Sequence, residues 1–150
     1  RALSPWCQRV VIKIGSAVLS NGSEFDHHSF QSLVQGVATL RAANIQVAVV
    51  CSGAVALGMA KLGFSERPTQ LGQLQALASV GQGELAARWA DALAEHELVS
   101  AQVLLTHDDL KNRRRFISAR QTLRELLELG TIPIINENDA VAVEEIKMRP

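Results

Sequence analysis

The chain has 150 residues, of which 47% are hydrophobic and 20% charged, and its 15 basic side chains balance its 15 acidic ones. This length and composition are typical of a soluble globular domain with a sizeable core. The zero net charge gives no support for nucleic acid or an acidic membrane surface as a partner, and no apolar run reaches the roughly 18 residues that a membrane-spanning helix needs.

The first predicted element is a strand over Val10–Ile14 that opens into a Gly-Ser loop. β-branched residues surround Lys13, a pattern typical of a parallel strand buried on both faces. A lysine there needs an anionic partner, because an unpaired buried ammonium is costly. Gly15 and Ser16 would let backbone N–H groups approach that anion, which we interpret as the phosphate tail of a nucleotide. The alternative is a strand-end lysine whose ammonium reaches solvent.

A helix is predicted next, from an N-cap at Asp26 to about residue 43, after a polar loop at Asn21–Glu24. The uncharged run Ile45–Val50 predicts a second strand. Small residues then lead into another helix, which is expected to end near Gly63, a suitable C-cap.

Ser52 and Gly53 lie in this strand-to-helix connection. Small residues at that place form anion sites in doubly wound sheets. Ser52 would either cap the helix or offer its hydroxyl and backbone amide to a carboxylate or phosphate. The loop after the first strand and this one would converge on one crevice. This favours ligand binding by Ser52 over helix capping. Cys51 and the distant Cys7 form no Cys/His cluster, which favours reduced thiols in a cytoplasmic protein and argues against zinc.

A long helical segment is predicted to reach about His96, and its Gly81 and Gly83 are interpreted as positions of close helix packing, since no strand precedes them. Val99–Leu105 predicts the third strand. A helix follows over Arg114–Leu129, closed by Gly130.

The fourth predicted strand, Thr131–Ile135, contains Pro133, which favours an edge position or a strand end. The segment Ala140–Ile146 is predicted to be extended. Because apolar strands alternate with longer helical patterns, the sequence predicts βαβ units around a mostly parallel sheet, an α/β fold.

The polar run Asn136–Asp139 follows this last strand. Asn and Asp favour turns, so a structural loop is one explanation. Four consecutive acid or amide side chains could also recognise an ammonium group, with Asp139 as its partner and Asn136 helping to orient it.

With these residues assembled, the chain resembles the glutamate 5-kinases of the amino acid kinase family. The resemblance runs over residues 9–147 and is carried by VVIKIGSAVLS (Val10–Ser20), VAVVCSGAVALG (Val47–Gly58), AQVLLTHDDL (Ala101–Leu110) and the long stretch Phe116–Lys147. It implies a three-layer αβα sandwich with a mainly parallel sheet. It also implies ATP-dependent phosphorylation of the L-glutamate side-chain carboxylate to glutamyl 5-phosphate, the first step of proline biosynthesis. Such enzymes use Mg2+ with ATP, and are cytoplasmic homo-oligomers that proline commonly inhibits.

The resemblance also implies roles for single residues. Lys13 would be the catalytic residue and bind the transferring phosphoryl group, and the other assigned residues are Gly15 and Ser16 for ATP phosphate and Ser52, Gly53, Asn136 and Asp139 for glutamate. No residue is assigned to a metal. Direct in-line phosphoryl transfer, the mechanism that the resemblance implies, needs no enzyme nucleophile. This agrees with the sequence, in which no Ser/His/Asp or Cys/His arrangement is visible.

In the family, Glu-Ile-Lys continues into Gly-Asp-Asn-Asp and then into a nucleotide-binding half, whereas Met148-Arg149-Pro150 stand here. We therefore expect residues 1–8 to be an N-terminal extension and residues 9–150 to be the amino-acid-binding part of a kinase domain, without the nucleotide-binding half. Two alternatives are a non-catalytic glutamate- or proline-sensing domain and the kinase portion of a bifunctional pyrroline-5-carboxylate synthase. A Rossmann-type oxidoreductase is disfavoured because no dinucleotide fingerprint follows the first strand.

Overall fold

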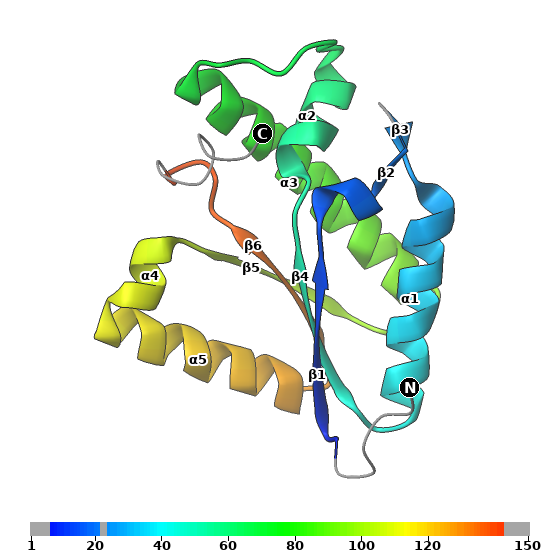
Figure 1. The fold of residues 1–150 in the computed structure, drawn as a ribbon. Coiled ribbons are helices and arrows are strands. Elements are labelled where there is room, and N and C mark those ends of the chain that lie inside the picture. The colour runs from blue at the N-terminus through cyan, green and yellow to red at the C-terminus, as the bar shows by residue number, and fades with distance from the viewer. Residues whose placement is uncertain (1–6, 22–23, 143–150) are drawn as a thin grey trace.

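The computed structural model describes residues 7–21 and 24–142. Its main sheet has four parallel strands in the order β1-β4-β6-β5 (Figure 1). The strands are β1 (Arg9–Ile14), β4 (Gln46–Cys51), β5 (Ser100–Leu105) and β6 (Ile132–Glu137). The prediction of a mainly parallel sheet is confirmed.

Helices cover both faces of this sheet (Figure 1). On one face lie α1 (His27–Ala42) and α3 (Leu71–Ala94), and on the other lies α5 (Arg113–Glu128). The shorter helices are α2 (Ala54–Leu62), which packs on α3, α4 (His107–Lys111), which leads into α5, and the single 3-10 turn η1 (Ser16–Val18). The three-layer αβα arrangement is therefore confirmed. No helix in the described ranges is both long and apolar enough to cross a membrane.

The core lies between the sheet and the layer formed by α1 and α3. β4 contributes Val47 and Val49, which are fully buried. Trp89 of α3 is also fully buried and meets Phe30 of α1 edge to face, with ring centroids 4.9 Å apart. Burying one large apolar side chain contributes about 1.5–3 kcal/mol, so this layer anchors the strands whose ends form the site.

Several predicted helix ends are confirmed. Asp26 caps α1, because its Oδ1 accepts a hydrogen bond from the Ser29 amide at 2.9 Å. Gly63 ends α2 in the left-handed region, at φ 73°. These ends could be read from the sequence because caps depend on local chemistry.

Other predicted boundaries shift. The expected loop at Asn21–Glu24 instead includes residues of an antiparallel hairpin, β2 (Ser20–Asn21) with β3 (Glu24–Phe25). Residues 140 and 141 lie in a turn closed by the Val141 amide on the Asn138 carbonyl, so they are not extended as predicted. Residues 143–146 of that segment lie outside the described residues.

The prediction that the first strand is buried on both faces is wrong. β1 is an edge strand whose one neighbour in the sheet is β4. Lys13 is exposed, and Val11 on the same face is 62% exposed. Ile14 on the opposite face is buried in the core. The reason is tertiary, because α5 packs on β4 and β6 and leaves this face of β1 open.

The proline in the fourth strand is not at an edge. β6 lies between β4 and β5, and Pro133 is buried and paired with Ala101. Pro133 is the second residue of the strand, and pairing with β4 begins only at Ile134. The missing N–H thus falls before the part of β6 that bonds to both neighbours.

Two glycines bring α2 and α3 into close contact. A Cβ placed on Gly81 would lie 1.7 Å from the Ala54 carbonyl oxygen, and one placed on Gly58 would lie 1.9 Å from the Leu77 carbonyl oxygen. The interpretation of Gly81 as a packing glycine is confirmed. It is wrong for Gly83, where a Cβ would have no described atom within 4 Å.

Candidate functional site

The carboxyl ends of the main-sheet strands lie at one edge, at the top of Figure 1. The strand register pairs Ile14 of β1 with Cys51 of β4, and Val50 of β4 with Ile135 of β6. Asn136 is therefore level with Cys51. The three segments expected to bind ligand all lie next to this row of the sheet. They are Gly15–Ser16, Ser52–Gly53 and Asn136–Asp139. Their roles in binding stay predictions.

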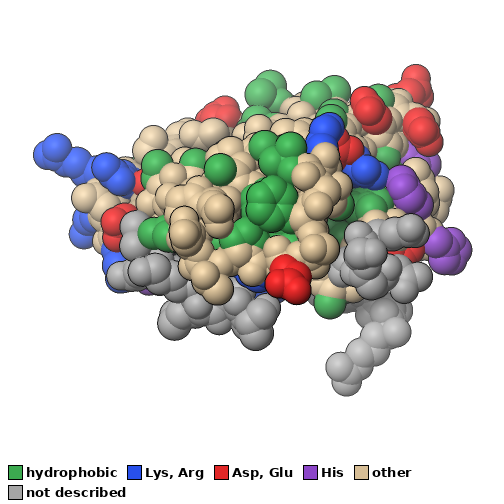
Figure 2. Space-filling model, turned by 90° about the horizontal axis from the view of Figure 1, so that it is seen from above, with side chains coloured by type: hydrophobic (Ala, Val, Ile, Leu, Met, Phe, Trp, Pro, Cys, Tyr) green, Lys and Arg blue, Asp and Glu red, His purple; other side chains and the backbone are tan. Residues whose placement is uncertain are grey.

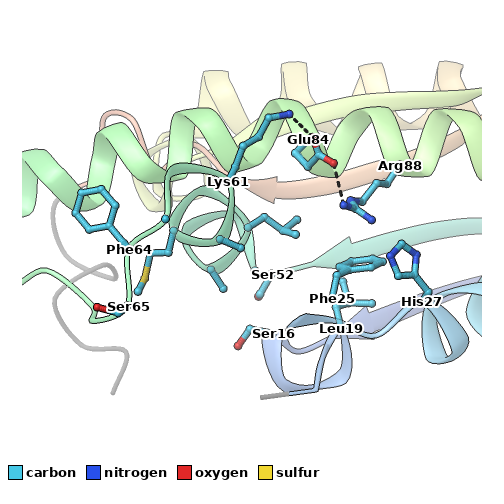
Figure 3. Close-up of a pocket in the computed structure, with 16 residues that line it drawn as sticks. Ser16, Leu19, Phe25, His27, Ser52, Lys61, Phe64, Ser65, Glu84 and Arg88 are labelled. Atoms are coloured by element: carbon cyan, nitrogen blue, oxygen red, sulfur yellow. Dashed lines mark hydrogen bonds and ion pairs between the residues drawn. The ribbon is translucent and has the colours of Figure 1, made fainter. Parts of the chain in front are cut away.

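The first two segments are in direct contact. The Ser52 amide donates a hydrogen bond to the Ile14 carbonyl at 3.1 Å. Gly53 has φ 113°, a conformation that favours glycine, and a Cβ there would lie 3.9 Å from Ser16. Figure 3 shows Ser16 and Ser52 beside each other at the lower wall of a cavity.

Ser52 does not cap the helix, which was one of its two expected roles. The N-cap of α2 is Gly53, with no side-chain hydrogen bond. The Ser52 amide was also expected to meet a ligand, but the Ile14 carbonyl occupies it. The half-buried hydroxyl makes no hydrogen bond to any residue of the described ranges, so it is the group through which Ser52 can bind a ligand.

Gly15 lies between Lys13 and Ser16 in ordinary extended backbone, with φ −76° and ψ 157°. A Cβ on Gly15 would have no described atom within 4 Å. Neither backbone strain nor packing within the described chain therefore requires glycine at this position, and the space beside it is open to a ligand.

The cavity at this edge has a volume of about 1090 Å³ and is lined by Ser16, Ser52 and Gly53, together with Phe25 and Phe64. Seen from above, hydrophobic side chains are exposed in the middle of this face, and basic, acidic and histidine side chains lie nearby (Figure 2). Of the predicted site residues, the cavity brings together three. The others, Lys13, Gly15, Asn136 and Asp139, do not line it.

A charged cluster forms the opposite wall of the cavity, and none of its residues was predicted from the sequence. Glu84 forms one ion pair with Lys61, at 2.6 Å, and a second with Arg88, at 2.9 Å (Figure 3). The hydrogen bond from Lys61 lowers the pKa of Glu84, and Arg88 lies 4.3 Å above the Phe25 ring. Two cations share one carboxylate, so the wall carries net positive charge. Glu84 and Arg88 lie four residues apart in α3, a spacing that could have revealed their pair from the sequence. No sequence signal joins Lys61 to them, because α2 and α3 meet only in the folded chain.

The third segment is buried. Asn136 is 5% and Asp139 is 6% exposed. Asn136 belongs to β6 rather than to the loop in which it was expected. Its Nδ2 donates a hydrogen bond to Oε1 of Gln82, a residue of α3 that is 9% exposed, at 2.7 Å. No sequence pattern had singled out Gln82.

A second cavity of about 560 Å³ lies beyond β5 and β6. Its wall includes Thr106 and Asp109, which form a capping box at the start of α4. Hydrogen bonds from Thr106 lower the pKa of Asp109, which also pairs with Arg115 at 3.2 Å. The spacing Thr106-x-x-Asp109 is a capping signal that could have revealed this short helix from the sequence.

No group of three or more His, Cys, Asp or Glu side chains that could hold a metal ion occurs among the residues that the structure describes.

Cys51 should resist thiol reagents. Burial raises the pKa of Cys51 to about 11, so at pH 8 only about one thiol in a thousand is the reactive thiolate. We expect Ellman's reagent to label Cys7 in native protein and to label Cys51 only after denaturant is added. A Cys7→Ser variant isolates the Cys51 signal, and rapid labelling of that variant without denaturant would contradict the buried placement.

Comparisons with known proteins show the family of this chain. A sequence profile described as the amino acid kinase family matches residues 8–149. Two curated relatives described as glutamate 5-kinase, from Halorhodospira halophila and Marinomonas sp., are each 52% identical over 141 residues, which is 93% of this chain. The chain spans 38% of the length of each of these relatives.

Solved structures show the same fold at low identity. The UMP kinase from Bacillus anthracis matches 85% of this chain and 52% of its own, with a TM-score of 0.53 and 13% identity. The UMP kinase from Ureaplasma parvum gives the same TM-score at 17% identity, with 85% of this chain and 54% of its own covered. Because the family profile matches nearly the whole chain, this chain belongs to the amino acid kinase family.

Proposed function

We propose that this chain supplies the amino-acid-binding part of a glutamate 5-kinase, which transfers the γ-phosphoryl group of ATP to the side-chain carboxylate of L-glutamate. The product, glutamyl 5-phosphate, would begin proline biosynthesis. The observation that carries the proposal is the contact between Ser16 and Gly53, which both line one cavity. That contact would set a phosphate loop beside an acceptor loop. The relatives at 52% identity point to glutamate as the acceptor.

On the phosphate side, the open space beside Gly15 supports the close approach of a phosphate oxygen to the backbone. Ser16 starts η1 and lines the cavity. Lys13 stands two residues before Gly15, and its exposed ammonium is free of the cost that a buried cation would carry. These three residues would hold the ATP phosphates.

On the acceptor side, the Ser52 hydroxyl and the cavity at Gly53 would receive a carboxylate of glutamate. The ammonium group of glutamate needs a negative partner. The buried carboxylate of Asp139 suits it, because a charge pair is stronger where water is excluded. Asn136 would add a neutral acceptor at the same strand end.

The proposed transfer is direct. A carboxylate oxygen of glutamate attacks the γ-phosphorus, the bond between that phosphorus and the β,γ-bridging oxygen breaks, and ADP leaves. The nucleophile is already ionised at neutral pH, so no enzyme base has to remove a proton. Two unit charges about 4 Å apart repel by about 4 kcal/mol near a protein surface, and Lys13 would offset that repulsion. Mg2+ bound to ATP would neutralise further phosphate charge. The phosphates can supply most of its ligands, so the described residues need provide no dedicated metal site.

The proposal extends to the setting of the enzyme. We expect a cytoplasmic homo-oligomer, with proline as a feedback inhibitor, as the resemblance to glutamate 5-kinases implies.

The proposal is tested by an ATP-dependent hydroxamate assay on the intact protein with glutamate, aspartate and N-acetylglutamate. Glutamate should give product. Aspartate should react roughly 10–200-fold less efficiently, because it lacks one methylene of reach. N-acetylglutamate should be rejected at least as strongly, because acetylation removes the ammonium group.

Equal rates with the three compounds would contradict the assigned acceptor site. Glutamate binding by calorimetry without any ATP-dependent hydroxamate would instead favour the non-catalytic sensor.

A further inference from the structure

We infer that Gln82 is a positioning residue of the glutamate site, which turns the Asn136 side chain so that its carbonyl oxygen meets the substrate ammonium. The inference rests on the proposed function and assigns a role to a residue outside the predicted site.

The first observation is the direction of the hydrogen bond. Asn136 Nδ2 donates to Gln82 Oε1 at 2.7 Å, and both side chains are at least nine-tenths buried. An amide has its donor and its acceptor on opposite branches. With the nitrogen turned to Gln82, the Oδ1 atom of Asn136 remains as the acceptor on the other side. An ammonium group has only donors, so it needs an acceptor there.

The second observation is the place of Gln82 in the fold. The preceding residue, Gly81, is the point at which α3 touches the Ala54 carbonyl at the start of α2. Ala54 directly follows Ser52 and Gly53. One turn of α3 therefore contacts the end of the acceptor loop through Gly81 and the end of β6 through Gln82. This links the two segments that are proposed to grip opposite parts of glutamate.

The third observation is the energetic cost of burying the Gln82 amide group. Gln82 Nε2 is buried and has no hydrogen-bond partner in the described ranges. An apolar side chain would fill the position without an unsatisfied donor. Packing alone therefore does not explain a glutamine here, whereas the need for its Oε1 acceptor does.

The test compares Gln82→Met with Gln82→Glu in the intact protein. Both side chains have the length of glutamine. Only Glu keeps an oxygen that can accept the Asn136 hydrogen bond. Gln82→Met should raise the KM for glutamate about tenfold with little change in the KM for ATP, the cost of one misplaced hydrogen bond. Gln82→Glu should recover most of the loss. The double variant Gln82→Met/Asn136→Ala should bind glutamate no worse than Asn136→Ala alone, because both changes remove the same contact.

A second readout does not depend on activity. The side-chain NH2 signals of Asn136 in 15N-labelled protein, identified by their loss in Asn136→Ala, should move in Gln82→Met and stay in Gln82→Glu. The inference would be overturned by equal glutamate KM values in the two Gln82 variants. It would also be overturned if the Asn136 signals did not move in Gln82→Met. A wild-type protein that makes no glutamyl hydroxamate would instead refute the proposed function, and the NMR comparison would still decide whether Gln82 orients Asn136.

Discussion

Gly81→Ala should lower the free energy of unfolding of the intact protein by about 3 kcal/mol, the upper end of the usual cost of overpacking. The added Cβ would lie 1.7 Å from the Ala54 carbonyl oxygen and 2.6 Å from the Gly58 amide nitrogen. Both are backbone atoms, so no flexible side chain can move aside. The helices α2 and α3 must separate, and the start of α2 must shift with them.

Gly83→Ala is the matched control, since it makes the same change two residues along the same helix. Gly83 is exposed, and no described atom lies within 4 Å of its added Cβ. Alanine there should raise stability by about 0.5–1 kcal/mol, because glycine is a poor helix former. Urea midpoints at constant slope measure the difference. Equal midpoints for the two variants would mean that α2 and α3 are not in contact at Gly81.

The same displacement has a functional consequence. Ala54 directly follows Ser52 and Gly53, which are proposed to bind glutamate. Any folded fraction of Gly81→Ala should therefore require more glutamate for half-maximal rate than Gly83→Ala does.

Lys13→Met should lower kcat by about 10²–10³-fold, with little change in the KM for glutamate, because the proposed charge neutralisation acts on the transferring phosphoryl group. Because Lys13 is exposed on β1, its loss should leave the unfolding midpoint close to that of the wild type. A steady-state comparison of kcat and KM, alongside the midpoint, separates a catalytic loss from misfolding.

Two further variants sharpen this experiment. Lys111→Met removes another exposed lysine, at the end of α4, and should leave kcat unchanged. Asp139→Asn removes the proposed ammonium partner and should mainly raise the KM for glutamate. Near-normal turnover in Lys13→Met would remove that lysine from the mechanism.

The alternation of strands and helices, the parallel sheet and several helix ends were all predictable from local chemistry. Asp26 and Gly63 are examples, because a cap depends on a few neighbouring residues. The common edge for the segments after β1, β4 and β6 was predictable too. Parallel strands carry their carboxyl ends to the same side, whatever their order in the sheet.

The neighbours of each strand were not predictable. The β-branched residues around Lys13 are compatible with an edge strand and with a central strand. The strand order β1-β4-β6-β5 places β1 at the edge, where Lys13 is exposed. Pro133 predicted either an edge position or a strand end. β6 is central, and the proline is tolerated near the start of the strand because pairing with β4 begins only at Ile134.

Local patterns along this chain record which residues form strands and helices and which residues cap several helix ends, and these features were predicted from the residues alone. Contacts between distant segments decided the rest: Gly81 against Ala54, Gln82 against Asn136, and Glu84 between Lys61 and Arg88. Except for Glu84 and Arg88, which lie one turn apart in α3, these contacts join parts of the chain whose separation carries no periodic signal. Those contacts exist only once the helices have packed.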